Sequence, residues 1–157
     1  MYRTMMALLI GAISGLTSTN IAHAASMNFS TSIQSTCAIA VTREGTLVPR
    51  RNARVLNSNG AGGQNGLATV TTNADIFQLH VDQPTGFDVK PAADTTPEQD
   101  FRARIRSAGA TTFNWTRNSQ NLNAGNNNVR VQFRARKAPG VTFATGLYSA
   151  TVVIRCE

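Results

Sequence analysis

The stretch Gly146-Leu-Tyr-Ser-Ala-Thr-Val-Val-Ile-Arg-Cys156, one residue from the end of the chain, decides the fold. Its residues alternate between two faces, with Tyr148, Ala150, Val152 and Ile154 together on one of them. Alternation with a period of two, in a run rich in β-branched residues, predicts a strand that packs on one face. This strand ends at a cysteine.

The chain contains only one other cysteine, Cys37. Two cysteines in an exported chain favour one disulfide, so we expect Cys37 and Cys156 to tie the last strand back to the beginning of the domain. Closing so long a loop would contribute about 4–5 kcal/mol in the chain-entropy model. The alternatives are two free buried thiols or an intermolecular bridge.

The first 24 residues are typical of a secretory signal peptide. A basic start at Arg3 precedes an apolar run over residues 5–16, and Ala22-His-Ala24 is a small-x-small cleavage site. The run is shorter than the about 20 residues that span a bilayer. We therefore expect a single exported domain over residues 25–157, without a transmembrane segment after cleavage, in the periplasm, at the cell surface or outside the cell.

The rest of the chain predicts an all-β fold. It contains about eight to ten short alternating runs separated by Gly, Asn and Pro, without helical periodicity, which favours an antiparallel sandwich or barrel. Residues 67–72 and 75–82 have hairpin-like spacing, and residues 57–66, 91–99 and 118–128 are expected to be loops. The main expected strands cover residues 26–33, 36–42, 46–48, 54–56, 67–72, 75–82, 101–106, 111–116, 129–136 and 147–156.

The sequence predicts no catalytic or metal centre and no cofactor. His80 is the only histidine left after signal cleavage, and we expect it to be an exposed strand residue rather than part of a serine triad. The carboxylates of residues 94–100 are interrupted by Pro97 and match no calcium loop, so a solvated loop is expected. The glycines of residues 60–66 precede no predicted helix, as a phosphate-binding loop would require.

Arginines are the most informative surface residues. After cleavage the chain carries 14 Lys+Arg against 8 Asp+Glu, a net charge of +6. If the strands at residues 101–106 and 129–136 are neighbours, their outward arginines form one basic face, suited to anionic polysaccharide or lipid head groups. The alternative is that outward charge only keeps the sheet from pairing with others. Nucleic acid is not an expected partner, because Phe101 and Phe133 point inward. The arginines concerned are Arg102, Arg104, Arg106, Arg130, Arg134 and Arg136.

Two motifs carry a family resemblance. Ser35-Thr-Cys-Ala-Ile-Ala-Val41 and the closing Gly146-x-Tyr148-x-x-Thr-Val-x-Ile154 pattern resemble bacterial secreted proteins of the spore-coat-U type, relatives of chaperone–usher pilus subunits. The resemblance implies an immunoglobulin-like antiparallel β-sandwich and a structural or adhesive role outside the inner membrane. It also implies like subunits or a periplasmic chaperone as partners.

In pilus subunits, the N-terminal extension of one subunit supplies a strand to the next. By resemblance, residues 26–33 would be this donor strand, with Met27, Phe29 and Ile33 as the residues that fill pockets. The alternative is that residues 26–33 pair with their own sheet. The protein would then be a self-contained domain that binds an anionic ligand through its arginine face.

Overall fold

The computed structural model describes residues 26–157, so the predicted signal peptide lies outside the described residues. All regular elements of this part of the chain are strands, which confirms the all-β prediction. Among residues 26–157 there is no helix of the length and apolarity needed to cross a membrane. The strands are β1 (Cys37–Arg43), β2 (Val48–Arg50), β3 (Val55–Asn57), β4 (Gly66–Thr72), β5 (Gln78–Val81), β6 (Asp100–Gly109), β7 (Phe113–Thr116), β8 (Gln120–Asn121), β9 (Gly125–Arg136) and β10 (Ile154–Cys156).

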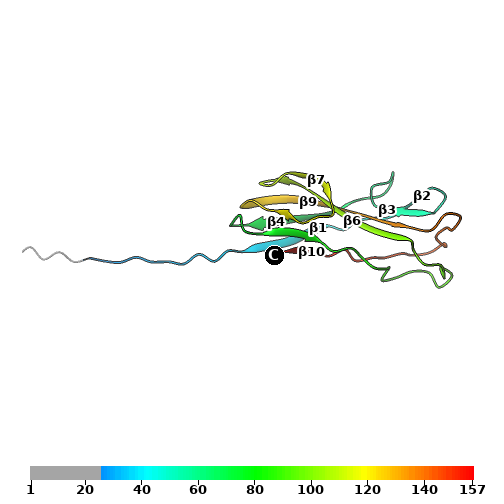
Figure 1. Cartoon of the computed structure of the whole chain (residues 1–157), viewed down its shortest axis with the longest axis horizontal. Coiled ribbons are helices and arrows are strands. Elements are labelled where there is room, and N and C mark those ends of the chain that lie inside the picture. The colour runs from blue at the N-terminus through cyan, green and yellow to red at the C-terminus, as the bar shows by residue number, and fades with distance from the viewer. Residues whose placement is uncertain (1–25) are drawn as a thin grey trace, which may run out of the picture. The chain divides into compact units, whose positions relative to one another are not determined.

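Two antiparallel sheets form an immunoglobulin-like sandwich (Figure 1). The long strand β9 organises the larger sheet: β6 and then β7 lie along one edge, and β4 and β3 share the other. β1 extends this sheet beyond β4, and β2 extends it beyond β3. The smaller sheet has the order β10-β5-β8.

Side chains from both sheets fill the space between them. One core cluster joins Val70, Ile105 and Val129 of the larger sheet to Leu79 and Val81 of the smaller. A second cluster is aromatic and includes Phe133 and Phe143 with Leu56 and Ala135, against which Phe87, Phe101 and Tyr148 pack. Burial of these large side chains supplies the main driving force for folding. The inward alternation predicted for β6 and β9 is therefore confirmed.

Three predictions for the interior of the chain differ from the structure. Residues 67–72 and 75–82 do not form a hairpin, because β4 lies in the larger sheet and β5 in the smaller. The connection crosses the sandwich so that Leu79 and Val81 cover the same core from the opposite side. The predicted loop at residues 118–128 contains β8 and the start of β9. The strand predicted at residues 46–48 is displaced, because β2 begins at Val48 and includes Pro49. β2 is an edge strand, so the missing N–H of Pro49 costs no ladder hydrogen bond.

The two ends of the domain depart furthest from expectation. Of the strand predicted at residues 147–156, only β10 is paired as a strand, with one isolated bridge between Val89 and Ser149. Residues 26–33 form no strand at all, which contradicts the expected first strand. Residues 26–32 are also a unit separate from residues 33–157.

Candidate functional site

A groove of about 450 Å³ lies between β1 and the C-terminal segment. Its lining residues come from β1, β4, β9, residues 148–152 and Ile154, and from the connecting residues Glu44, Gly45, Leu47 and Ser58, all within the unit of residues 33–157. Arg43, Glu44, Ser58, Ser149 and Thr151 are its polar lining. Its apolar lining consists of Val41, Leu47, Leu67, Ala68, Val131, Phe133, Tyr148, Ala150, Val152 and Ile154.

The first wall of the groove is the edge strand β1. Among residues 26–157, β1 pairs with β4 on one side only, so within this part of the chain its other edge presents unpaired backbone N–H and C=O groups. Val41 lines the groove and is 69% exposed, although it is a β-branched apolar residue. The register shifts between Val41 and Arg43, where a bulge ends the regular part of this edge.

The second wall is the C-terminal segment before β10. Ser149 N donates to Val89 O at 3.0 Å, and Val153 O accepts from Asp82 N at 2.9 Å. The backbone groups of Ser149 and Val153 therefore face Val89 and Asp82. Backbone groups alternate along a strand, so those of Ala150 and Val152 face the groove. The predicted strand at residues 147–156 is thus extended, but it lacks a partner on its groove side among the described residues.

The floor of the groove is apolar and firmly packed. Phe133 is buried, and the side chains of Tyr148, Ala150 and Val152 pack against its cluster. Tyr148 contacts Phe87 and Phe143 edge-on, with ring centroids 5.0 and 5.3 Å apart. Such aromatic pairs hold the floor in one arrangement.

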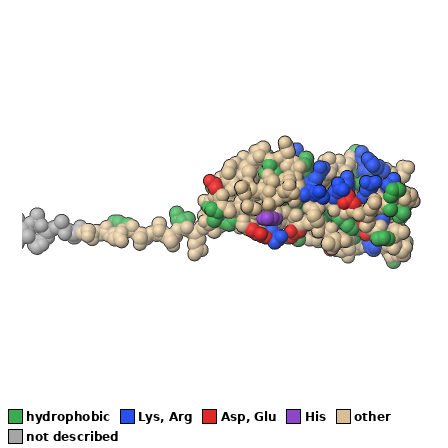
Figure 2. Space-filling model, viewed as in Figure 1, with side chains coloured by type: hydrophobic (Ala, Val, Ile, Leu, Met, Phe, Trp, Pro, Cys, Tyr) green, Lys and Arg blue, Asp and Glu red, His purple; other side chains and the backbone are tan. Residues whose placement is uncertain are grey.

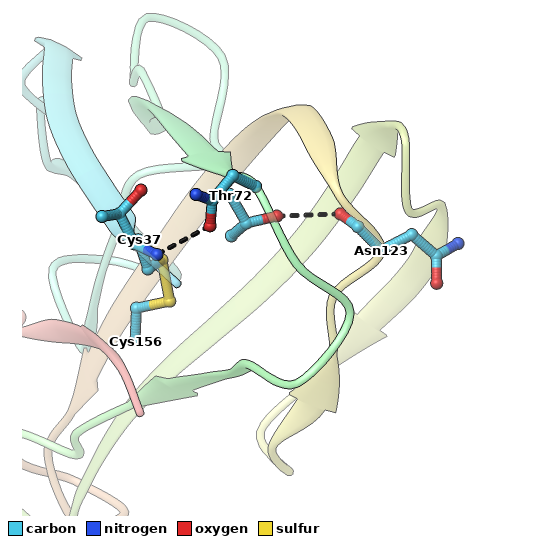
Figure 3. The surroundings of a disulfide bond; sticks show 6 residues. Cys37, Thr72, Asn123 and Cys156 are labelled. Atoms are coloured by element: carbon cyan, nitrogen blue, oxygen red, sulfur yellow. Dashed lines mark hydrogen bonds between the residues drawn. A yellow bond between two sulfur atoms is a disulfide. The ribbon is translucent and has the colours of Figure 1, made fainter. Parts of the chain in front are cut away.

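The predicted disulfide is present and closes one end of the groove. Cys37 begins β1 and Cys156 ends β10, and their Cα atoms are 6.4 Å apart (Figure 3). On the side of β1 away from Cys156, Cys37 pairs with Thr72, whose hydroxyl donates to Asn123 O at 3.0 Å. A strand placed between two others needs about 9.5 Å between its neighbours. The groove can therefore admit a strand only beyond the disulfide, beside residues 39–43 and 148–154.

The candidate donor segment precedes β1 directly. Met27, Phe29 and Ile33 are 82%, 88% and 85% exposed, a large exposure for side chains of this size. Residues 34–36 are held by the side chain of Asn73, which accepts from Thr36 N at 2.7 Å and donates to Gln34 O at 2.8 Å. Folding residues 26–33 back beside β1 would need a reversal at residues 34–36, which would break these hydrogen bonds.

A buried ion cluster anchors the C-terminal wall. Lys137 is fully buried, and its Nζ lies 2.6 Å from Asp94 Oδ1 and 2.9 Å from Glu98 Oε1, with Thr96 O as a third acceptor. Tyr148 Oη donates to Asp94 Oδ2 at 2.6 Å and so connects the groove floor to this cluster. The solvated loop predicted at residues 94–100 is wrong for Asp94, because a buried carboxylate requires such partners.

The electrostatics of the cluster follow from these contacts. Burial alone would raise the pKa of Asp94, but hydrogen bonds from Lys137 and Tyr148 outweigh burial and hold this pKa below its ordinary value. Burial and the neighbouring Asp94 raise the pKa of Tyr148, so its hydroxyl keeps its proton. Residues 26–157 contain no group of three or more His, Cys, Asp or Glu arranged to hold a metal ion. The contacts of Lys137 and Tyr148 connect the floor of the groove to residues 94–98.

Lys137 could have been found from the sequence. It continues the inward alternation of Val129, Val131, Phe133 and Ala135 beyond the end of β9. A lysine at an inward position demands a buried carboxylate, and the nearby acidic residues 94–100 supply it.

The predicted arginine residues lie together on the outer face of the larger sheet. β6 and β9 are direct neighbours, and their register places Arg102 opposite Arg134 and Arg106 opposite Arg130. Asp100 contacts both Arg102 and Arg134, at 2.8 and 2.9 Å. Burial would raise the pKa of Asp100, but these two guanidinium groups hold it below its ordinary value. His80 lies apart from this face, on β5, with Nε2 3.8 Å from Glu157 Oε2.

Comparison with protein-family models, with curated proteins and with solved structures finds no match to this chain.

Proposed function

We propose that the protein is an exported, non-enzymatic structural or adhesive subunit whose groove takes up an extended strand from another copy of the chain. The observation that carries the proposal is the groove between β1 and residues 148–153, which lies above an apolar floor and whose two facing backbone edges have no strand partner within residues 26–157. An added strand would satisfy backbone groups on both walls, and its alternate side chains would cover the floor. This matches the mode of assembly implied by the resemblance to pilus subunits.

Residues 26–33 have the chemistry of the donor. The apolar residues Met27, Phe29 and Ile33 are two and four positions apart, so an extended chain presents all three on one face. They are exposed in this chain, while the groove floor is apolar. The hydrogen bonds between Asn73 and residues 34–36 favour donation to another copy over insertion into the chain's own groove.

The disulfide is compatible with an oxidising location. We place the protein in the periplasm, at the cell surface or outside the cell, in keeping with the predicted signal peptide. Before assembly, a periplasmic chaperone strand could occupy the same groove, as the resemblance implies.

The test compares the mature chain with the Phe29→Asp variant. The unmodified chain should form oligomers whose mass, measured by light scattering, grows with concentration. Phe29→Asp should remain monomeric, because the added charge would lie against the apolar floor of the groove, yet it should still bind a synthetic peptide of residues 26–34.

Asn28→Asp is the matched control. It adds the same charge at the neighbouring position, on the opposite face of the extended segment. It should oligomerise like the unmodified chain. The proposal would be overturned if Phe29→Asp formed oligomers as the unmodified chain does, or if Phe29→Asp and Asn28→Asp lost oligomerisation to the same extent.

A further inference from the structure

The outer face of the larger sheet concentrates the positive charge of the protein. Figure 2 shows Lys and Arg side chains gathered over one part of the molecule, with an acidic group among them. The register of the strands explains this cluster. One row of paired residues runs across β2, β3, β9 and β6 and consists of Arg50, Val55, Arg136 and Asp100. The next row on the same face pairs Arg102 with Arg134. The two rows after it contain Arg104, and then Arg106 paired with Arg130. Paired residues of neighbouring strands point to the same side of a sheet, so all these arginines share one face.

A hollow deepens one end of this arginine face. It measures about 390 Å³ and is lined by Arg50, Arg51, Val55, Asn57, Arg134 and Arg136. Arg51, Asn52 and Ala53 have φ angles of 54, 52 and 57°, a conformation that non-glycine residues rarely adopt. Three such residues in succession are strained, and strain of this kind is concentrated at binding sites. Here the strained turn directly follows Arg50 and contains Arg51, so it presents both side chains at the hollow.

The balance of charge on the arginine face is strongly positive. Eight arginines lie on it or line its hollow, and Asp100 pairs with only Arg102 and Arg134 among them. Like charges directly opposite each other destabilise a sheet, as at Arg106 and Arg130. This concentration of guanidinium groups on one face suits an anionic ligand.

Trp115 adds an aromatic surface to the same face. Its ring lies 5.3 Å from the Arg106 guanidinium and 5.8 Å from that of Arg104. Cation–π contact orders these two guanidinium groups before any ligand arrives. The sequence predicts a strand at residues 111–116, but only the β6–β7 pairing places Trp115 beside the arginines.

We propose that the arginine face, from the hollow at Arg50 and Arg134 to Trp115, binds a linear anionic polysaccharide through its carboxylate or sulfate groups. Arginines two positions apart on a strand lie about 6.8 Å apart, and their planar groups hold carboxylate or sulfate in a two-pronged geometry. A lipid surface fits less well, because the face offers Trp115 but no group of exposed apolar side chains among the described residues. Nucleic acid fits less well, because single strands are bound by several aromatics in series, whereas Phe101 and Phe133 point into the core and Trp115 alone lies beside Arg104 and Arg106 among the described residues.

The site is independent of the groove. Successive residues of β9 point to opposite sides, so Phe133 lines the groove while Arg134 lies on the arginine face. A chain whose groove is filled would keep this face exposed, and failure of one proposal leaves the other standing.

The test uses the single tryptophan as a local reporter on the mature chain. Trp115 is the only tryptophan, so its fluorescence reports on this face. Titration with heparin, as the sulfated probe, or polygalacturonate, as the carboxylated one, should give a saturable change that weakens as salt rises. Arg104→Gln/Arg130→Gln should weaken binding at least about tenfold, with a shallower salt dependence, because two ionic contacts are lost.

Lys90→Gln/Arg155→Gln is the control, since it removes the same charge away from the arginine face and should change binding less than about twofold. Equal weakening by both double variants would show that only net charge matters, and would overturn the proposal. Absence of saturable binding at 50 mM salt would also overturn it. So would a preference of about tenfold or more for duplex DNA, or for phosphatidylglycerol vesicles, over both polysaccharides.

Discussion

Cys37 and Cys156 join the first strand of the domain to its last, with a sequence separation of 119 residues. These two strands also lead into the two walls of the groove. The disulfide therefore fixes the spacing of the walls at one end and constrains the unfolded chain. Stability therefore depends on this link, and the strand binding that we propose would depend on it as well.

Removing the disulfide should lower the free energy of unfolding. We expect Cys156→Ser to lose about 4–5 kcal/mol, because the unfolded chain regains the entropy of a long closed loop. Urea denaturation without reductant measures the loss. The double variant Cys37→Ser/Cys156→Ser should lose the same amount of unfolding free energy, and this equality would exclude an effect of the free Cys37 thiol in the single variant. A change of less than about 1 kcal/mol in both variants would contradict the prediction.

Lys137→Met should destabilise the domain strongly. Lys137 is the shared partner of Asp94 and Glu98, and its loss leaves two poorly solvated carboxylates uncompensated. Breaking a buried pair in this way costs about 3–5 kcal/mol. Asp94→Asn/Lys137→Met should cost less than the sum of the two single variants, because the unpaired charge at residue 94 is removed. Additive costs in a double-mutant cycle by urea denaturation would show that the two residues are not coupled.

Acid should destabilise the domain through Asp94 and Asp100. Hydrogen bonds and nearby cations hold the pKa values of both carboxyls in the folded chain below the ordinary aspartate value of about 3.9. At a pH between the folded-state and unfolded-state pKa values, the unfolded chain therefore binds more protons than the folded one. Their stabilisation is present above about pH 4 and is lost as the pH falls through the lower, folded-state pKa values. Asp100→Asn should be less stable at pH 7 and should lose less on acidification. Urea midpoints between pH 7 and pH 2.5 measure both effects, and an unchanged acid slope would contradict the assignment.

The alternation of apolar and polar residues predicted the long, fully paired strands β6 and β9. β6 and β9 are clear in the sequence because inward Ala103, Ile105 and Val131 alternate with outward charge. The C-terminal segment shows the same alternation, yet only its last residues are paired. Alternation reports which face is buried, whereas strand pairing depends on a neighbour along the edge. The sequence could therefore predict the floor of the groove but not its unpaired edge.

The arginine face was also predictable only in part from the local sequence pattern. Its outward arginines on β6 and β9 follow from the strand period alone. Arg50 and Trp115 were not predicted to join them, because their positions depend on pairing between β2 and β3 and between β6 and β7. Such contacts between different strands are set by the whole fold rather than by local pattern.

The edge of β1 offers the sharpest test of the groove. Val41→Glu should leave the free energy of unfolding within about 0.5 kcal/mol, because Val41 is 69% exposed. It should weaken binding of the residue 26–34 peptide to the Phe29→Asp chain at least about tenfold, since an added strand would cover the charge. Ile76→Glu is matched in exposure, at 70%, and lies outside the groove. Fluorescence anisotropy of the labelled peptide should therefore give unchanged affinity for Ile76→Glu. Equal weakening by both substitutions would place the binding elsewhere.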